Sequence, residues 1–449
     1  MATDEANANI DWLQVERDVE RLFSSAPLSP ADLQGHSRLE ALYPGRASEV
    51  RLLMRAVRDP AKHILLYGER GLGKTSLANT FWMRSHTPQR PILVARIQVH
   101  PFDDFSSLWA RALDEFQSIN FYETESARID LTSISPESIR REFQKLPPNV
   151  TNIVIIDEFD QLQANEAREL TAHLLKFLHD HAVNVTVLLI GVAENVEELI
   201  INHQSLRRVL SLVKLERMNA SDLNEILDSR LRLTPLRLCN EARSELVALS
   251  CGLPYYAQAL GKLAALNAIN DHRDSIDVND VDAAIENFLV ESGQSFSADY
   301  EQAIESQQPD NIFCEVILAC ALAVSDAGGV VEPAAVAKTL SLVMPNKSQP
   351  LARIRHCMSL FSSDRRGKIL TRIGRKGDYR YRFSDALMRP FIIIRSIKDH
   401  SIDENSRGIL FHSHEKRIRD AGYRLGIAEA YVAQLGMIAP TFAEKADSE

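Results

Sequence analysis

Phosphate-binding chemistry is the clearest prediction of this sequence, and it rests on the segment 65–77, LLYGERGLGKTSL. Glycines at this spacing let the backbone turn tightly and point its N–H groups at a phosphate. In such a loop Lys74 would reach the β and γ phosphates, and the hydroxyl of Thr75 would hold Mg²⁺. The spacing of Gly68, four further residues, Gly73, Lys74 and Thr75 fits a P-loop and predicts that the chain binds ATP with Mg²⁺. The residues expected to contact the nucleotide are Gly68, Glu69, Arg70, Gly71, Leu72, Gly73, Lys74, Thr75 and Ser76.

Two adjacent carboxylates, Asp157 and Glu158, directly follow a second apolar run, NIVII at 152–156. ATP hydrolysis requires that the γ phosphate be neutralised and that a water molecule be aligned against it. We expect Asp157 to hold Mg²⁺ together with Thr75, and Glu158 to polarise the attacking water. The pair therefore predicts an ATPase that forms ADP and phosphate. The alternative is that these acidic residues only begin a helix, where negative charge is favourable.

Apolar runs alternate with helical patterns in the part of the chain that carries these residues. Strands are expected at 63–67, 91–99, 152–156, 185–191 and 213–215, and helices at 76–85, 100–116, 136–146 and 166–182. Strands that are apolar along their whole length are typical of a parallel sheet covered on both faces. The sequence thus predicts an α/β fold whose parallel sheet positions the phosphate loop.

Strands stop near residue 219, and two further regions follow. Four helices expected at 221–233, 240–250, 254–268 and 278–292 would form a lid. Helical patterns at 312–324, 332–343 and 349–361 precede a hairpin around the turn GRKG at 374–377, which together predict a winged helix. The expected domains are a helical lead-in at 1–40, the α/β domain at 41–218, the lid at 219–292, a connector at 293–311, the winged helix at 312–399 and a helical or disordered tail at 400–449.

The motifs GERGLGKTSL and IIDEFD resemble those of P-loop NTPases of the AAA+ and STAND types. The segment YPGRASE at 43–49 is similar to the GRxxE segment that precedes the P-loop in origin-initiator AAA+ proteins and in STAND proteins. The chain also resembles origin-initiator-like and archaeal-type ATPases. The resemblance implies an AAA+-like domain with a C-terminal winged helix, and it implies that Gly45 and Arg46 lie near the adenine. The segment Gly-Leu-Pro ending at Pro254 resembles a STAND segment in which the proline lies close to the nucleotide. The competing interpretation of Pro254 is an ordinary first position of a helix.

Three more catalytic residues are implied by the resemblance. Asn195 follows the strand expected at 185–191 and has the residue type of a γ-phosphate sensor, although Glu194 could take that position and a helix cap is an alternative. Arg207 and Arg208 occur where similar AAA+ proteins supply an arginine to the ATP site of a neighbouring copy. Such an arginine would imply a homo-oligomer, whereas the alternative is an exposed residue that makes only surface ion pairs.

Charge is unevenly distributed in this acidic chain, whose formal charge is −10. Residues 353–382 contain ten Lys or Arg against two Asp. A basic winged helix could bind double-stranded DNA through phosphate contacts. A solvated strand face, or a clamp on the nucleotide domain as in STAND proteins, would explain the same residues. The candidate DNA contacts are Arg353, Arg355, Arg372, Arg375, Lys376 and Arg380.

Composition adds broad limits. The 449 residues, 45% of them hydrophobic, include no apolar run near the roughly 18 residues of a membrane helix and no secretion signal, which predicts a cytoplasmic protein without a membrane partner. The five cysteines are expected to be small core residues. The favoured function is a Mg-ATP-dependent switch of the lid and winged helix that controls DNA binding or assembly. A signalling or defence switch whose winged helix binds protein, and a scaffold that holds ATP structurally, remain as alternatives.

Overall fold

The chain forms two compact units in a computed structural model. The described residues are 10–24, 45–59, 62–83, 85–118, 134–146, 149–192, 206, 208–291, 293–308, 310–323, 325–326, 328–344, 347–375 and 377–399. One unit comprises Ala26–Glu216 and is called the sheet unit here, and the other comprises Met1–Ser25 with Arg217–Glu449 and is called the helical unit. The chain therefore passes between the units twice, after Ser25 and after Glu216.

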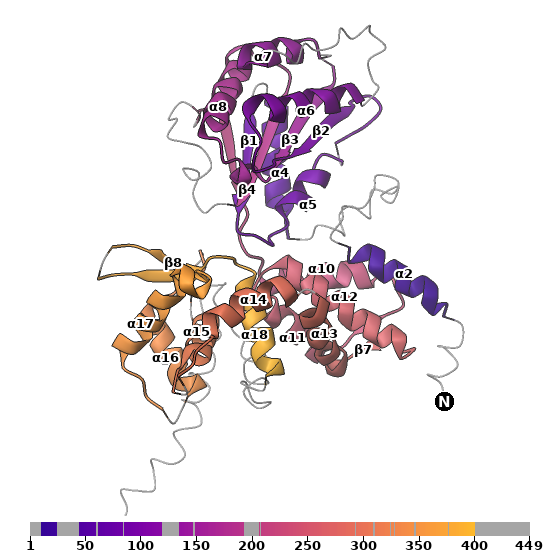
Figure 1. The fold of residues 1–449 in the computed structure, drawn as a ribbon. Coiled ribbons are helices and arrows are strands. Elements are labelled where there is room, and N and C mark those ends of the chain that lie inside the picture. The colour runs from indigo at the N-terminus through magenta and orange to yellow at the C-terminus, as the bar shows by residue number, and fades with distance from the viewer. Residues whose placement is uncertain are drawn as a thin grey trace, which may run out of the picture. The chain divides into compact units, whose positions relative to one another are not determined.

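A five-stranded parallel sheet forms the centre of the sheet unit (Figure 1). Its strands are β1 (His63–Gly68), β2 (Ile92–Gln98), β3 (Thr151–Asp157), β4 (Thr186–Val192) and β5 (Leu210–Lys214). Their order across the sheet is β2-β3-β4-β1-β5, and every pairing is parallel. The predicted parallel α/β fold is confirmed. Because β4 separates β1 from β3, the carboxyl ends of two strands that are distant in sequence lie on either side of one neighbour.

Helices cover both faces of this sheet (Figure 1). The helices α6 (Phe105–Ser118), α7 (Pro136–Gln144) and α8 (Asn165–Asp180) share one hydrophobic cluster with the inward side chains of β2, β3 and β4. Within it the rings of Trp109 and Phe143 meet edge to face, with 6.2 Å between centroids. The helices α4 (Ala47–Arg58) and α5 (Lys74–Thr80) contact β1 and contribute no residue to that cluster, which places them on the other face.

Two helix boundaries in the sheet unit differ from the prediction. The helix expected at 100–116 begins only at Phe105, because the carboxylate of Asp104 accepts a hydrogen bond from Ser107 N at 2.7 Å and so caps the first turn. The helix expected at 76–85 is α5, which starts at Lys74 and ends at Thr80. Thr80 Oγ1 donates back to Ser76 O at 2.8 Å, a bond that weakens helix continuation.

Four helices of the helical unit occur close to the positions expected for a lid. They are α10 (Ala220–Leu231), α11 (Asn240–Leu249), α12 (Pro254–Asn270) and α13 (Val278–Glu291), and the two-residue strands β6 (Arg237–Leu238) and β7 (Ser275–Ile276) pair beside them. The N-terminal helix α2 (Trp12–Leu22) packs against α10 and α12. The buried guanidinium of Arg230 donates to Leu22 O at 2.9 Å, so the predicted lead-in helix is part of the helical unit.

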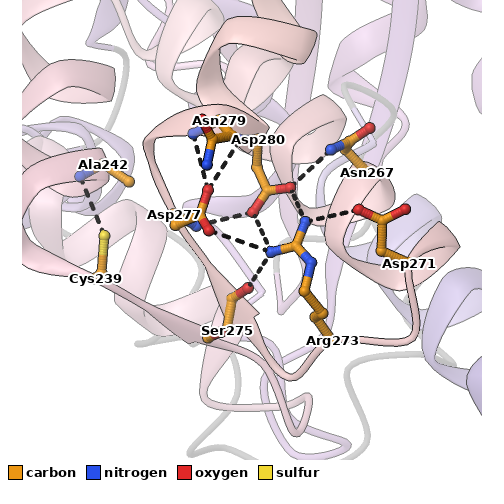
Figure 2. A network of polar contacts seen from close by, with 9 residues as sticks. All are labelled: Cys239, Ala242, Asn267, Asp271, Arg273, Ser275, Asp277, Asn279 and Asp280. Atoms are coloured by element: carbon orange, nitrogen blue, oxygen red, sulfur yellow. Dashed lines mark hydrogen bonds and ion pairs between the residues drawn. The ribbon is translucent and has the colours of Figure 1, made fainter.

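A network of polar contacts fixes the start of α13 (Figure 2). Asp280 is fully buried, and its carboxylate accepts hydrogen bonds from the guanidinium of Arg273, from Asn267 Nδ2 at 2.7 Å and from Asp277 N at 2.8 Å. Asp277 in turn accepts from Asn279 N at 2.8 Å, which caps the helix. A buried carboxylate needs such partners, and together they lower the pKa of Asp280 against the raising effect of burial.

The C-terminal part of the helical unit contains three helices, a hairpin and a final helix. These elements are α15 (Phe313–Leu322), α16 (Pro333–Val343), α17 (Leu351–Phe361), β8 (Leu370–Ile373), β9 (Arg380–Phe383) and α18 (Met388–Lys398), preceded by α14 (Gly293–Ile304). The hairpin turn has Gly374 and Gly377 at φ of 98° and 102°, values that glycine adopts without strain. Val331 pairs with Tyr381 and adds a third short extended segment to the hairpin. The elements thus follow the order predicted for a winged helix.

The cysteine prediction is confirmed in part. Cys251, Cys320 and Cys357 are buried and Cys239 is partly buried, but Cys314 is exposed, so its interpretation as a core residue is wrong. Cys314 is the second residue of α15 and precedes the buried run of that helix, which the apolar pattern alone did not reveal. Across the residues that the structure describes, no helix has the length and apolar character required to cross a membrane.

Candidate functional site

The phosphate loop connects β1 to α5 and depends on three glycines in unusual backbone conformations. Gly68, Gly71 and Gly73 have φ values of 149°, 83° and 82°. A Cβ atom on Gly68 would lie 2.5 Å from Leu215 O, so only glycine fits between the loop and the end of β5. A Cβ on Gly73 would meet no heavy atom within 4 Å, so the space beside this residue is open. The loop therefore leads into α5 with its first N–H groups beside an open cradle.

Lys74 lies across this loop. Its side chain is buried, and Nζ donates to Gly68 O at 3.0 Å and to Glu69 O at 2.7 Å. Burial lowers the pKa of Lys74 to about 8, although the negative charges of Asp160 and Asp157 act in the opposite direction. The ammonium group is thus held at the loop with two carboxylates near it.

Asp157 ends β3 and is buried, as the prediction for a metal-holding carboxylate requires. One carboxylate oxygen accepts from Glu158 N at 2.9 Å, and the other lies 3.7 Å from the guanidinium of Arg96. Thr75, the second expected metal ligand, is half-buried in the first turn of α5. A hydroxyl and a carboxylate are hard oxygen donors, the kind that Mg²⁺ prefers.

Glu158 is exposed and has a left-handed backbone, with φ of 56° and ψ of 40°. Its carboxylate accepts a hydrogen bond from Gln98 Nε2 at 2.7 Å. Gln98 ends β2 and stands opposite Asp157 in the strand register. The sequence analysis did not single out Gln98 or Arg96, because their approach to the acidic pair depends on the pairing of β2 with β3.

Asp160 is a further residue that the sequence analysis missed. Its carboxylate accepts from Val192 N at 2.8 Å at the end of β4, and its carbonyl accepts from Arg168 Nη2 at 3.0 Å. These bonds fix the segment after Asp157 against the neighbouring strand. The only signal in the sequence was the second Asp of IIDEFD, which the sequence analysis did not use.

Arg46 is buried at the start of α4, next to Gly45 with φ of 73°. Its guanidinium donates to Glu49 Oε1 at 3.0 Å, to Glu216 O at 2.9 Å and to Leu72 O at 3.4 Å. The pKa of Glu49 is lowered because hydrogen bonds from Ser48 and Arg46 outweigh the opposing effect of burial. The structure thus places Arg46 between the phosphate loop and the end of the sheet unit.

Other predicted site residues lie elsewhere or outside the described residues. Pro254 is the first residue of α12 in the helical unit, and Arg208 is exposed just before β5. The predicted sensor Asn195, the arginine Arg207 and the hairpin residue Lys376 are not among the residues that the structure describes.

The basic residues of the C-terminal region fall into two groups. Arg353 donates to Gln349 Oε1 at 3.0 Å and to Asp310 O at 2.7 Å, and Arg372 donates to Ser359 O at 2.9 Å. These two guanidinium groups therefore support the fold. Arg355, Arg375 and Arg380 form the second group of predicted DNA contacts, and all five of these arginines are exposed.

Comparisons with known proteins find one family that resembles the part of the chain containing the loop and the acidic strand. Residues 57–200 match a family model described as AAA domain. A search of curated proteins finds no match.

Solved structures similar to the chain include three at 13–16% sequence identity. They are the ORC2 protein of Aeropyrum pernix (16% identity, TM-score 0.49, covering 85% of this chain and 98% of that one), Cdc6p of Pyrobaculum aerophilum (13%, 0.44, 85% and 98%) and the RuvB Holliday junction branch migration motor of Thermotoga maritima (15%, 0.41, 80% and 96%). Likenesses of this size carry no argument about activity. The family match spans β1, the phosphate loop and β3, and residues 57–200 are therefore similar to an AAA domain.

Proposed function

We propose that the protein is an AAA+-type ATPase that binds Mg-ATP in the sheet unit and hydrolyses it slowly to ADP and phosphate. The observation that carries this proposal is the position of Lys74, which is held on the phosphate loop and is influenced electrostatically by Asp157 and Asp160 from the end of β3. Lys74 and these two acidic residues are thus close enough to interact electrostatically, as residues that hold a phosphate and its metal must be.

The residues present fit Mg-ATP, as judged by the open cradle at Gly73 and the oxygen donors at the site. Bound Mg²⁺ would neutralise charge on the phosphates, held by the Thr75 hydroxyl and the Asp157 carboxylate. The loop residues Gly68 to Ser76 would contact the phosphates through backbone N–H groups, and Lys74 through its ammonium. Glu158 would orient the attacking water.

The remaining catalytic assignments extend this proposal to parts of the chain beyond the loop. Asn195 would sense the γ phosphate, and Arg207 or Arg208 would enter the ATP site of a second copy in a homo-oligomer. Gly45 and Pro254 would lie near the base of the nucleotide. Each assignment follows the family resemblance and depends on assembly or on the ATP-bound arrangement of the two units.

Hydrolysis is tested by Glu158→Gln, which removes the charge that polarises water but keeps the size of the side chain. ATP affinity should be retained and turnover should fall by at least about a hundredfold, as expected when a general base is lost. Lys74→Ala serves as a control that should lose ATP binding. If Glu158→Gln still turns over ATP at the wild-type rate, the role of Glu158 is wrong.

DNA binding is proposed for the region 312–399, as a winged helix that follows the lid 219–292 and the connector 293–311. Its exposed basic residues include Arg355 on α17 and Arg375 and Arg380 on the hairpin. Arg375→Glu with Lys376→Glu should weaken binding to duplex DNA, and the wild-type affinity should fall steeply with salt. The matched control is Arg51→Glu with Arg55→Glu, an equal charge change at two exposed positions of α4. Equal losses in both double variants would refute specific DNA contacts by the hairpin.

A protein-binding switch is the second candidate function, and one contact in the helical unit favours it. Tyr256 on α12 is buried, and its hydroxyl donates to Leu387 O, at the start of α18, at 2.6 Å. This hydrogen bond joins the region 312–399 to helix α12 of the proposed lid. Under this alternative, the hairpin variants would leave DNA affinity at background and change the oligomeric state measured by size exclusion with ATP and with ADP.

A further inference from the structure

Arg46 joins two backbone segments that are 144 residues apart in the sequence, Leu72 and Glu216. Its Nη2 atom donates to Glu216 O at 2.9 Å and lies 3.4 Å from Leu72 O. Leu72 belongs to the phosphate loop, and Glu216 is the last residue of the sheet unit. A guanidinium has a rigid planar fork of donors, so a displacement of either carbonyl changes its bond to the other.

The segment 215–218, called the exit segment here, meets the loop at a second place. Leu215 N donates to Tyr67 O at 2.8 Å, and Leu215 O would lie 2.5 Å from a Cβ on Gly68. The exit segment therefore packs against the first glycine of the loop, while Arg46 connects it to Leu72 near the loop's end. The beginning and the end of the loop are both coupled to one short piece of backbone.

The exit segment continues into the helical unit, where its last two residues have hydrogen-bond acceptors. Met218 N donates to Gly252 O at 2.9 Å, and Arg217 Nη1 donates to Cys251 O at 3.3 Å. These acceptors lie in the short connection between α11 and α12, where Cys251 and Gly252 have φ of 47° and 81°. Leu215 and Glu216 thus have their bonds within the sheet unit, and Arg217 and Met218 have theirs within the helical unit.

We propose that Arg46 is a positioning residue that transmits nucleotide binding at the phosphate loop to the exit segment. When phosphates order the loop, the carbonyl of Leu72 becomes fixed, and Arg46 then fixes Glu216 O at the end of the sheet unit. Arg46 acts through these two carbonyls and does not itself bind the nucleotide. This inference rests on the proposed binding of ATP.

The guanidinium of Arg46 has little capacity left for a ligand. Three of its bonds go to protein oxygens, and the side chain is 6% exposed. Nε is the one atom of this group that is buried without a partner. If Arg46 had only a structural role, its ion pair with Glu49 would be its main contact. Glu49→Gln is therefore a matched control, because it removes the charge of that pair and leaves both bonds to the carbonyls.

Hydrogen exchange measured by mass spectrometry on the full chain tests the proposal. Peptides covering 68–76 and 214–219 are compared with and without a non-hydrolysable ATP analogue and Mg²⁺. In the wild type both peptides should exchange more slowly with the analogue, the second by about fivefold or more, the lower end of typical coupling between sites. Arg46→Lys should keep the slowing at 68–76 and lose it at 214–219, because one ammonium cannot reproduce the fork. Glu49→Gln should behave as the wild type.

Each other outcome overturns the inference. A wild type that slows at 68–76 but not at 214–219 shows that the exit segment does not respond. Arg46→Lys with wild-type slowing at both peptides shows that Arg46 is not the connection, and a loss of nucleotide affinity beyond tenfold shows that it binds the nucleotide directly. If the wild type shows no change at 68–76, ATP binding itself fails as a proposal. Should Arg46→Lys not fold, Arg46→Gln takes its place, with the same expected and contrary results.

Discussion

His63 makes the stability of the sheet unit sensitive to acid. It is the first residue of β1 and is fully buried. Nδ1 accepts from Val187 N at 3.1 Å, and Nε2 donates to Leu175 O at 3.0 Å. Both ring nitrogens are thus used by a neutral imidazole that joins β1, β4 and α8. Burial lowers the pKa of His63 from 6.5 to about 3.

The sign of the pH effect follows from this lowered pKa. Between pH 6.5 and 3 the unfolded chain binds a proton at His63 and the folded chain does not. The contribution of His63 to the free energy of unfolding is therefore complete above pH 6.5. It decreases by up to about 1.4 kcal/mol per pH unit as the pH falls.

The size of this pH effect can be measured by replacing His63 with glutamine. At pH 7, His63→Gln should lower the free energy of unfolding by about 2–4 kcal/mol, because two buried hydrogen bonds lose their geometry. The variant has no imidazole to protonate, so the wild type should lose stability relative to it on acidification. From pH 6.5 to 4.5 the difference between the two proteins should shrink by about 2–3 kcal/mol.

Denaturant titrations followed by tryptophan fluorescence can measure this difference. The sheet unit contains Trp82 and Trp109, so a Trp12→Phe background removes the signal of the helical unit. His181→Gln at an exposed position serves as the control and should show a difference that is small at every pH. A His63→Gln difference that stays constant from pH 6.5 to 4.5 would refute the assignment of a buried neutral imidazole.

Three further predictions concern single contacts. Gly68→Ala should lower ATP affinity at least tenfold and the free energy of unfolding by about 1–3 kcal/mol, measured by calorimetric titration and denaturation, because the methyl group meets backbone oxygen at a strained φ. Asp280→Ala should lower the midpoint of thermal unfolding of the helical unit, at a cost of about 3–5 kcal/mol for the buried partners left unpaired, whereas Asp271→Ala at its exposed edge should cost less than about 1 kcal/mol. Gln98→Ala should lower ATP turnover about fivefold with unchanged ATP affinity, since Glu158 loses a hydrogen bond of roughly 1 kcal/mol.

The local motifs of this chain were readable from the sequence because each occupies one continuous run. The segment Gly68–Thr75 contains the glycines that its own turn requires, and Asp157 follows the apolar strand that positions it. The parallel sheet was equally predictable, since β1, β3 and β4 are buried along almost their whole length, although β2 contains Arg96 and Gln98. In each of these cases the residues that determine a feature lie close to it in the sequence.

Contacts between distant segments were not predictable in the same way. Gln98 meets Glu158 only because β2 pairs with β3 in a register that places it opposite the end of β3. Arg46 meets Glu216 across 170 residues, and nothing near Arg46 specifies that acceptor. The same applies to α2, whose helical pattern was clear while its packing on α10 and α12 depends on the fold of residues two hundred positions later.

The basic C-terminal region shows why charge counting overstates a binding surface, and this leads to a quantitative test of DNA binding. Six residues were predicted to contact phosphates, but the guanidinium groups of Arg353 and Arg372 already donate to oxygens of the protein. Since the affinity for duplex DNA changes with salt as about 0.9 per phosphate neutralised, six contacts predict a slope of log K against log salt near −5.4 and four predict about −3.6. We expect the shallower value, with little further change in Arg372→Gln. A slope near −5.4 that becomes shallower by about 1 in Arg372→Gln would show that this side chain leaves Ser359 to bind DNA, and would refute its assignment to the fold.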